Sequence, residues 1–138
     1  MPAAVTQAPT ARLDLRDRSV LVIEDDLRAQ DAMSALVAQW GCRPIVASST
    51  GEALRKVAAE RRRPDLVLAD YRLGDGLTGV QAVHALARSV GSIPAILVTG
   101  DTDPARLRDA QASGIPLLHK PVREAQLRAA IEGLFLPA

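Results

Sequence analysis

The chain has 138 residues, near the commonest size of a single domain, and 48% of them are hydrophobic, which is enough for a globular core. The net charge of +1 gives no overall attraction to nucleic acid or to an anionic membrane. A single cysteine, Cys42, excludes an intrachain disulfide framework, and no apolar run is long enough to span a bilayer. Any function must therefore depend on where particular residues are placed.

Residues 1–17 mix Pro, Ala, Thr and Arg with no hydrophobic period, which predicts a flexible leader or linker. They lack the central apolar block of a secretory signal peptide, so we expect a cytoplasmic chain. Residues 18–138 are predicted to form one domain that contacts neither nucleic acid nor membrane.

The first part of that domain alternates short apolar runs with helical patterns. Residues 19–23 (SVLVI) predict a buried strand, and the apolar spacing that follows predicts a helix ending at Gly41. A second strand is expected at 44–47. Ser49 and Glu52 have the spacing of a capping box, which marks the start of a second helix.

The same alternation continues three more times. Residues 65–69 predict a third strand and residues 94–99 a fourth, each followed by a helical pattern. Asp103 and Pro104 are typical of the first residues of the fourth helix. A short fifth strand is expected at 115–119, before a last helix. Because the strands are apolar throughout, helices should cover both faces of a parallel sheet, which predicts an α/β, doubly wound fold of five βα units.

Polar side chains stand at the ends of four of these strands. They are Glu24, Asp25 and Asp26 after the first, Asp70 after the third, Thr99 ending the fourth, and His119 and Lys120 at the fifth. The carboxyl ends of parallel strands share one edge of a sheet, so these groups should meet there. Clustered carboxylates repel unless a cation neutralises them, and Mg²⁺ is the natural partner. Beside such an ion, Asp70 can accept a phosphoryl group, with Lys120 and Thr99 offsetting its charge.

Four segments carry a resemblance to a known family: VLVIEDD, PDLVLADYRL, AILVTGD and LLHKPV. In this order, each at a strand end, they resemble the signature of the response-regulator receiver domain of two-component signalling, over residues 18 to 136. The family has a flavodoxin-like sheet of strand order 2-1-3-4-5. DYRLGDG, together with VTGDTDP and LLHKPV, resembles receivers at the C-terminus of hybrid sensor histidine kinases. A hybrid kinase is therefore the expected origin, with a single-domain regulator as the alternative.

The resemblance implies a role for each residue of the predicted site. Glu24, Asp25, Asp70 and the backbone carbonyl of Arg72 would be the Mg²⁺ ligands, and Asp70 the phosphoacceptor. Thr99, Gly100 and Lys120 would be the phosphate-binding and switch residues, with a cis proline at Pro121.

The stretch GDGLTG, residues 74–79, also fits the G-x-G-x-x-G pattern of dinucleotide-binding loops. Such a loop should follow its strand directly, usually the first strand, where EDD would repel a pyrophosphate. We therefore expect the three glycines to allow turns with positive φ on the way into the third helix.

Three positions of the predicted site depart from the common pattern or vary within the family. Leu117 stands where many receivers have an aromatic residue that rotates on activation, so that mechanism is not expected here. Arg72 and Asp101 lie two residues beyond Asp70 and Thr99, and we expect them to pair across the mouth of the site. Such a pair would affect the lifetime of the phosphorylated state.

The predicted function is that of a phosphoacceptor, not of an enzyme acting on external substrates. The phosphoryl group would come from a phosphohistidine of a sensor kinase or phosphotransfer protein. Modification would change the face made by the fourth helix, the fifth strand and the fifth helix, where a partner or a second copy would bind. The alternative is a pseudo-receiver, a protein-binding module of the same fold that is never phosphorylated. An aspartyl phosphatase would need a second carboxylate at the position of Arg72.

Overall fold

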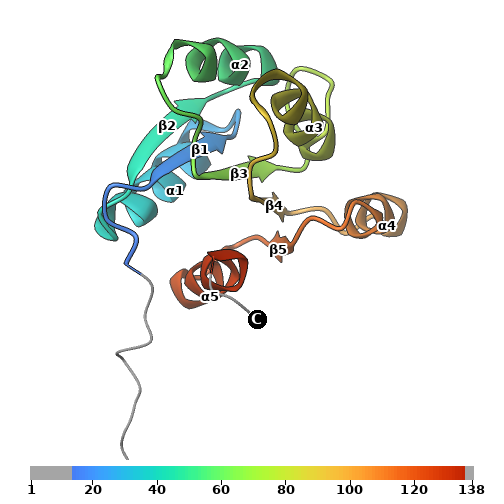
Figure 1. Cartoon of the computed structure of the whole chain (residues 1–138). Helices are drawn as coiled ribbons and strands as arrows, with labels where there is room; N and C mark the ends of the chain where they lie inside the picture. The colour runs from blue at the N-terminus through green and yellow to red at the C-terminus, as the bar shows by residue number, and fades with distance from the viewer. Residues whose placement is uncertain (1–13, 136–138) are drawn as a thin grey trace, which may run out of the picture.

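A single parallel sheet forms the centre of the computed structural model, which describes residues 14–135 (Figure 1). Its strand order is β2-β1-β3-β4-β5, which confirms the predicted flavodoxin-like topology. The strands are β1 (Ser19–Ile23), β2 (Arg43–Ala47), β3 (Leu66–Asp70), β4 (Ala95–Thr99) and β5 (Leu117–His119). Each begins and ends within two residues of its predicted position.

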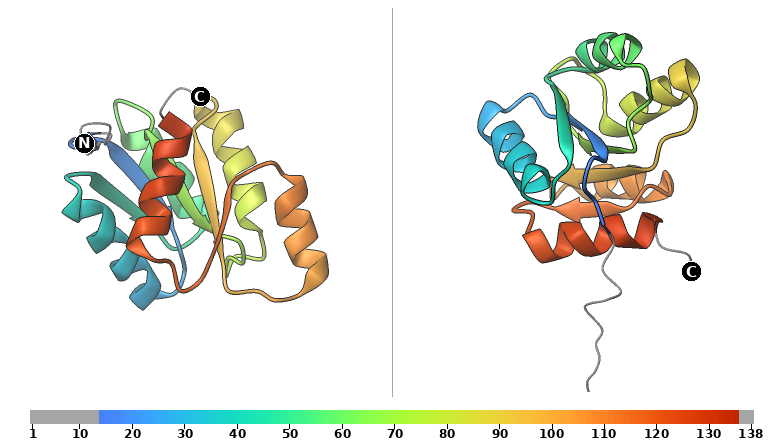
Figure 2. Two further views of the ribbon diagram at one scale, coloured as in Figure 1. Left: turned by 90° about the horizontal axis from the view of Figure 1, so that it is seen from below. Right: turned by 60° about the vertical axis from the view of Figure 1, so that its left-hand side comes forward.

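Five helices cover the sheet: α1 (Leu27–Gln39), α2 (Thr50–Ala59), α3 (Gly79–Val90), α4 (Pro104–Ala112) and α5 (Glu124–Phe135). Helices α1 and α5 lie on one face and the other three on the opposite face (Figure 2). Side chains of a strand alternate between the faces, so that Val20 and Val22 pack toward α1 and α5 while Leu21 and Ile23 pack toward α2 and α3. No helix in the range 14–135 is long and apolar enough to cross a bilayer.

Short polar side chains begin the helices, because the first N–H groups of a helix have no partner within it. Asp26 caps α1, and Asp103 caps α4 with Pro104 as the first helical residue, as predicted. The expected capping box of α2 is only half formed: Ser49 accepts from the N–H of Glu52, but the Glu52 carboxylate accepts from Ser48 instead of Ser49.

The packed part of the chain begins before residue 18. Leu15 is only 2% exposed and lies in the cluster beneath α1 and α5, and its carbonyl accepts the thiol of buried Cys42. Asp17 donates its N–H to the carbonyl of Gly41, whose φ of 86° confirms the predicted glycine position after α1. Residues 1–13 of the predicted leader lie outside the described residues.

Candidate functional site

The register of the sheet brings the predicted residues to one edge. Ile23 of β1 pairs with Ala69 of β3, so Glu24 and Asp70, one residue further along each strand, become neighbours. On the other side of β3, Asp70 pairs with Val98 of β4, and Thr99 pairs with His119 of β5. Lys120 follows directly, joined to Pro121 by a cis peptide as the resemblance implied.

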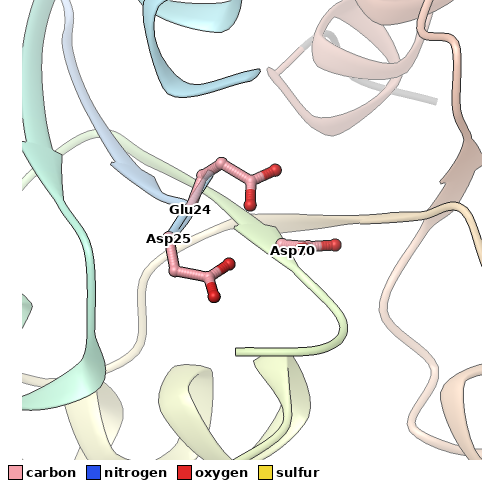
Figure 3. A group of neighbouring side chains, drawn as sticks. All are labelled: Glu24, Asp25 and Asp70. Carbon is pink, nitrogen blue, oxygen red and sulfur yellow. The ribbon is translucent and has the colours of Figure 1, made fainter. Parts of the chain in front are cut away.

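Three carboxylates gather at this edge from two adjacent strands (Figure 3). Oxygens of Glu24, Asp25 and Asp70 all lie within 4.8 Å of one another. Glu24 is buried, the side chain of Asp70 is 11% exposed, and Asp25 is open to solvent. Oxygen ligands at this spacing, with access for water on one side, suit a hard divalent cation such as Mg²⁺.

Lys120 faces the same carboxylates. Its Nζ lies 2.8 Å from Oε1 of Glu24 and 3.4 Å from Oδ1 of Asp70. Burial and the charge of Glu24 raise the pKa of Asp70 from 3.8 to about 6, against the opposing influence of Lys120. Burial acts to lower the pKa of Lys120, but its hydrogen bond to Glu24 and the charge of Asp70 outweigh burial and raise it. One ammonium therefore offsets only part of the negative charge, which favours a bound cation.

A cavity of about 290 Å³ opens beside Asp70. Its walls are Asp70, Arg72, Thr99, Gly100, Asp101, Thr102 and Lys120, which include every residue predicted to bind or modulate the phosphoryl group except Leu117. Thr99 is buried, and its Oγ1 accepts the N–H of Asp101 at 2.9 Å, so its own O–H can donate to a group in the cavity. Leu117 is half-buried against the core on the side of α4.

The glycines of GDGLTG have different roles, and the expectation of positive φ holds only for Gly76, whose φ is 83°. A Cβ on Gly74 would lie 2.6 Å from Oδ2 of Asp25, and one on Gly79 would lie 2.5 Å from the carbonyl oxygen of Asp70. These two glycines are required by close approach to the carboxylate site, a requirement that the sequence pattern does not reveal.

Arg72 and Asp101 do meet at the mouth of the cavity, with 3.8 Å between Nη1 and Oδ2. The shorter contact of Asp101, however, is with Arg106 of α4, whose Nη1 donates to the same oxygen at 3.2 Å. The carboxylate of Asp101 therefore lies between two cations, one from the loop after β3 and one from α4. Nothing in the sequence singled out Arg106, because a lone arginine on a polar helix is most often solvated.

Two further side chains support the site without having been predicted. Gln30 of α1 is buried, and its amide donates to the carbonyl of Glu24 at 3.0 Å and to the hydroxyl of Ser48 at 3.4 Å. Tyr71 is also buried, and its hydroxyl donates to Oδ2 of Asp109 in α4 at 2.6 Å. Burial and this bond raise the pKa of Tyr71 to about 12. Of these two residues, only Tyr71 could have been singled out from the sequence. It continues a buried strand, and the hydroxyl of a buried tyrosine needs a hydrogen-bond partner.

The family model described as the response regulator receiver domain matches residues 20–132, almost the whole described chain. The chain belongs to the response regulator receiver family. Among its relatives, this receiver is 36% identical over 80 residues to the phyllosphere-induced regulator PhyR of Methylorubrum extorquens, covering 58% of this chain and 30% of the relative. It is 29% identical over 131 residues to the acid tolerance regulatory protein ActR of Sinorhizobium medicae, covering 94% and 66%. The receiver thus spans less than two thirds of the length of these curated relatives.

Solved receiver structures show the same architecture. The receiver domain of PhyR from Erythrobacter litoralis superposes with a TM-score of 0.73 at 29% identity, covering 89% of this chain and 96% of that one. A response regulator receiver domain protein from Clostridium thermocellum gives a TM-score of 0.74 at 25% identity, covering 85% and 93%. The predicted family and fold are therefore confirmed, while the similarity to receivers of hybrid kinases stays a prediction.

Proposed function

We propose that this receiver accepts a phosphoryl group on Asp70 from a phosphohistidine of a sensor kinase or phosphotransfer protein. The observation that carries the proposal is the position of Asp70, in the wall of a cavity between a cluster of carboxylates and the ammonium of Lys120. Glu24, Asp25, Asp70 and the backbone carbonyl of Arg72 would hold Mg²⁺, which when bound supplies positive charge to the phosphoryl oxygens.

In the transfer step an oxygen of the Asp70 carboxylate attacks the phosphorus of the donor. The P–N bond to the donor histidine breaks, and its electron pair stays on the imidazole nitrogen. The Lys120 ammonium, next to Asp70 and Glu24, offsets negative charge on the phosphoryl oxygens. The Thr99 hydroxyl donates to one of those oxygens, and Gly100 leaves that side of the cavity unobstructed. Attack by water later releases phosphate, so the chain acts as a signalling acceptor and not as an enzyme on external substrates.

Incubation with Mg²⁺ and acetyl phosphate should add the mass of one phosphoryl group to the intact protein. The adduct should be absent from Asp70→Asn, which keeps the shape of the side chain but is a poor nucleophile, and from wild type without Mg²⁺. Intact-mass spectrometry measures all three samples. A wild type that gains no phosphoryl group and binds no beryllofluoride would be a pseudo-receiver, and an equal adduct on the variant would exclude Asp70 as the acceptor.

Arg72→Ala should shorten the lifetime of the phosphorylated protein. Arg72 and Asp101 line the mouth of the cavity, 3.8 Å apart, so removing the guanidinium should admit more water and speed dephosphorylation roughly threefold or more. The decay of the phosphorylated mass after removal of the donor measures the rate. Arg88→Ala, an exposed arginine on α3, is the control. Equal rates for Arg72→Ala and wild type would contradict this role.

The donor protein should dock on an apolar groove next to Lys120. Helix α1 and the segment after β5 enclose about 500 Å³ there, lined by Ala29, Ala32, Met33, Leu36, Lys120, Pro121 and Val122. Leu27, at the start of α1, is 64% exposed. An apolar groove that ends at the phosphoryl-binding lysine suits the helix that carries the donor histidine.

Met33→Glu should therefore slow phosphoryl transfer from a histidine phosphotransfer protein that modifies the wild type, by roughly tenfold or more. Incorporation from acetyl phosphate should be unchanged, because a small donor does not need the groove. Radiolabel transfer and intact mass measure the two reactions. Equal slowing with both donors would place the effect in the acceptor site and contradict docking.

We also infer a cytoplasmic location, where the phosphohistidine donors of such relays lie. The face of α4, β5 and α5 is our proposed surface for an output partner or for a homodimer. An origin within a hybrid kinase remains our proposal from the sequence resemblance.

A further inference from the structure

Helix α4 has little apolar anchorage. Of its nine residues only Ala110 is buried, with Leu107 half-buried beside it. Figures 1 and 2 show α4 at the margin of the molecule, beside β4 and β5. Because so little apolar surface fixes this helix, its polar contacts should have a large share in deciding where it lies.

Two polar contacts connect α4 to the loops that surround the acceptor. The Tyr71 hydroxyl donates to Oδ2 of Asp109 at 2.6 Å, and Nη1 of Arg106 donates to Oδ2 of Asp101 at 3.2 Å. Tyr71 is the residue after Asp70, and Asp101 lies two residues after Thr99. Each contact therefore joins α4 to a strand end that forms the phosphoryl site.

In the first of these contacts, Tyr71 is held firmly by the rest of the fold. The N–H of Tyr71 donates to the carbonyl of Val98 in β4 at 2.8 Å, and its carbonyl accepts the N–H of Gly79 at 2.8 Å. The side chain is buried, with the whole residue 4% exposed. The hydroxyl of Tyr71 is therefore held in place relative to β3, β4 and α3.

The second contact involves Asp101, which lies in a segment that phosphorylation should disturb. The Thr99 hydroxyl now accepts the N–H of Asp101 at 2.9 Å. The O–H can donate while Oγ1 accepts, but when the side chain turns to reach a phosphoryl group, Oγ1 moves away from the N–H of Asp101 and this bond is weakened or lost. Asp101, and with it the beginning of α4, is then free to shift, and the bond between Tyr71 and Asp109 is the contact that opposes this shift.

We propose that the Tyr71–Asp109 hydrogen bond is a latch that keeps α4 in its unphosphorylated position. Tyr71 is then a positioning residue that couples the state of Asp70 to α4, a role that Leu117 on β5 cannot perform by hydrogen bonding. The inference rests on the proposed phosphorylation of Asp70. A contact present only in the unphosphorylated arrangement lowers affinity for a phosphoryl group, so removing it should raise that affinity.

The test measures binding of beryllofluoride, which occupies the place of a phosphoryl group on an aspartate, in the presence of Mg²⁺. Tyr71→Phe removes only the hydroxyl and should bind beryllofluoride about fivefold more tightly than wild type. Before any addition, amide hydrogens of the helix residues after Pro104 should exchange faster in the variant than in wild type. Asp109→Ala, which removes the acceptor, should have the same effects, and Gln111→Ala, at an exposed residue on the same helix, should have none.

The double variant Tyr71→Phe/Asp109→Ala decides whether one bond carries both effects. If it does, the double variant should bind beryllofluoride no more tightly than either single variant, whereas independent effects would multiply and overturn the latch. If Tyr71 only stabilised the fold, Tyr71→Phe would lower the unfolding temperature without tightening the binding of beryllofluoride. That result would also overturn the latch. If wild type failed to bind beryllofluoride, the proposed function would be refuted and not the latch. The latch would then be refuted separately if amide hydrogens of α4 exchanged equally fast in free wild type and in Tyr71→Phe.

Discussion

Asp70→Asn should make the metal-free protein more stable at neutral pH, by up to roughly 3 kcal/mol. The cause is the cost of a charged carboxylate at this position, where burial and Glu24 raise the pKa of Asp70 from 3.8 to about 6. Asparagine has nearly the same shape but no charge, with an NH2 donor in place of one carboxylate oxygen. It therefore avoids this cost, while Lys120 keeps its closer partner, Glu24.

How the stability difference changes with pH follows from the pKa of Asp70 in the folded protein and in the unfolded chain. Folded protein holds a proton on Asp70 up to about pH 6, whereas the unfolded chain releases it near its ordinary pKa of 3.8. The stability that the proton confers is complete below the unfolded pKa and is lost as the pH rises through the folded pKa. The advantage of Asp70→Asn over wild type should thus be small near pH 4 and reach its full size above about pH 6.

Chemical denaturation of both proteins across this pH range, in the presence of a chelator, measures the difference. Asp31→Asn, an exposed carboxylate on α1, should change stability little at any of these pH values. Added Mg²⁺ should stabilise wild type more than Asp70→Asn, since a ligand that binds the folded state raises its stability by mass action. A variant less stable than wild type at neutral pH without metal would contradict the electrostatic account.

Gly79→Ala should destabilise the protein by about 1–3 kcal/mol. The new Cβ would lie 2.5 Å from the carbonyl oxygen of Asp70 and 2.9 Å from Cδ2 of Leu97. Leucine can shift its methyl group, but the carbonyl belongs to the backbone of β3, so relief of the contact must move Asp70 itself. Binding of beryllofluoride should weaken together with stability.

The matched control is Gly133→Ala in α5, where a Cβ would meet no atom within 4 Å. That substitution should raise stability by about 0.5–1 kcal/mol, because alanine loses less conformational freedom than glycine in a helix. Urea denaturation of both variants gives the two free energies. If Gly79→Ala and Gly133→Ala changed stability in the same direction, close packing at Gly79 would not be the reason for its glycine.

Much of the fold could be predicted because the sequence patterns that indicate its strands and helices involve neighbouring residues. Continuous apolar runs such as residues 19–23 and 94–99 indicated strands buried on both faces, and Asp103–Pro104 marked a helix start. The carboxylate cluster was predictable for the same reason, since polar residues that end parallel strands must share one edge of the sheet. Those rules required no knowledge of how the helices pack.

The tertiary structure decided which side chains meet across elements. Gln30 in α1 appears in the sequence as an ordinary helical residue, yet it is buried against the carbonyl of Glu24. Gly74 and Gly79 matched a pattern for positive φ, although the close approach of Asp25 and of the Asp70 backbone is what requires them. The contact of Tyr71 with Asp109 joins residues 38 positions apart along the chain. Asp101 and Arg106 are only five residues apart, but they meet because of how the loop after β4 turns into α4.

The sequence by itself determined the succession of strands and helices along the chain and the residues at the strand ends, because hydrophobic period and residue type are properties of neighbouring positions. The receiver family and its strand order followed from the resemblance of four motifs. Only the tertiary structure decided how α4 is attached to the strand ends that carry Asp70 and Thr99. That attachment depends on the distance and direction between side chains of separate elements, which packing of the whole domain sets and no local pattern records.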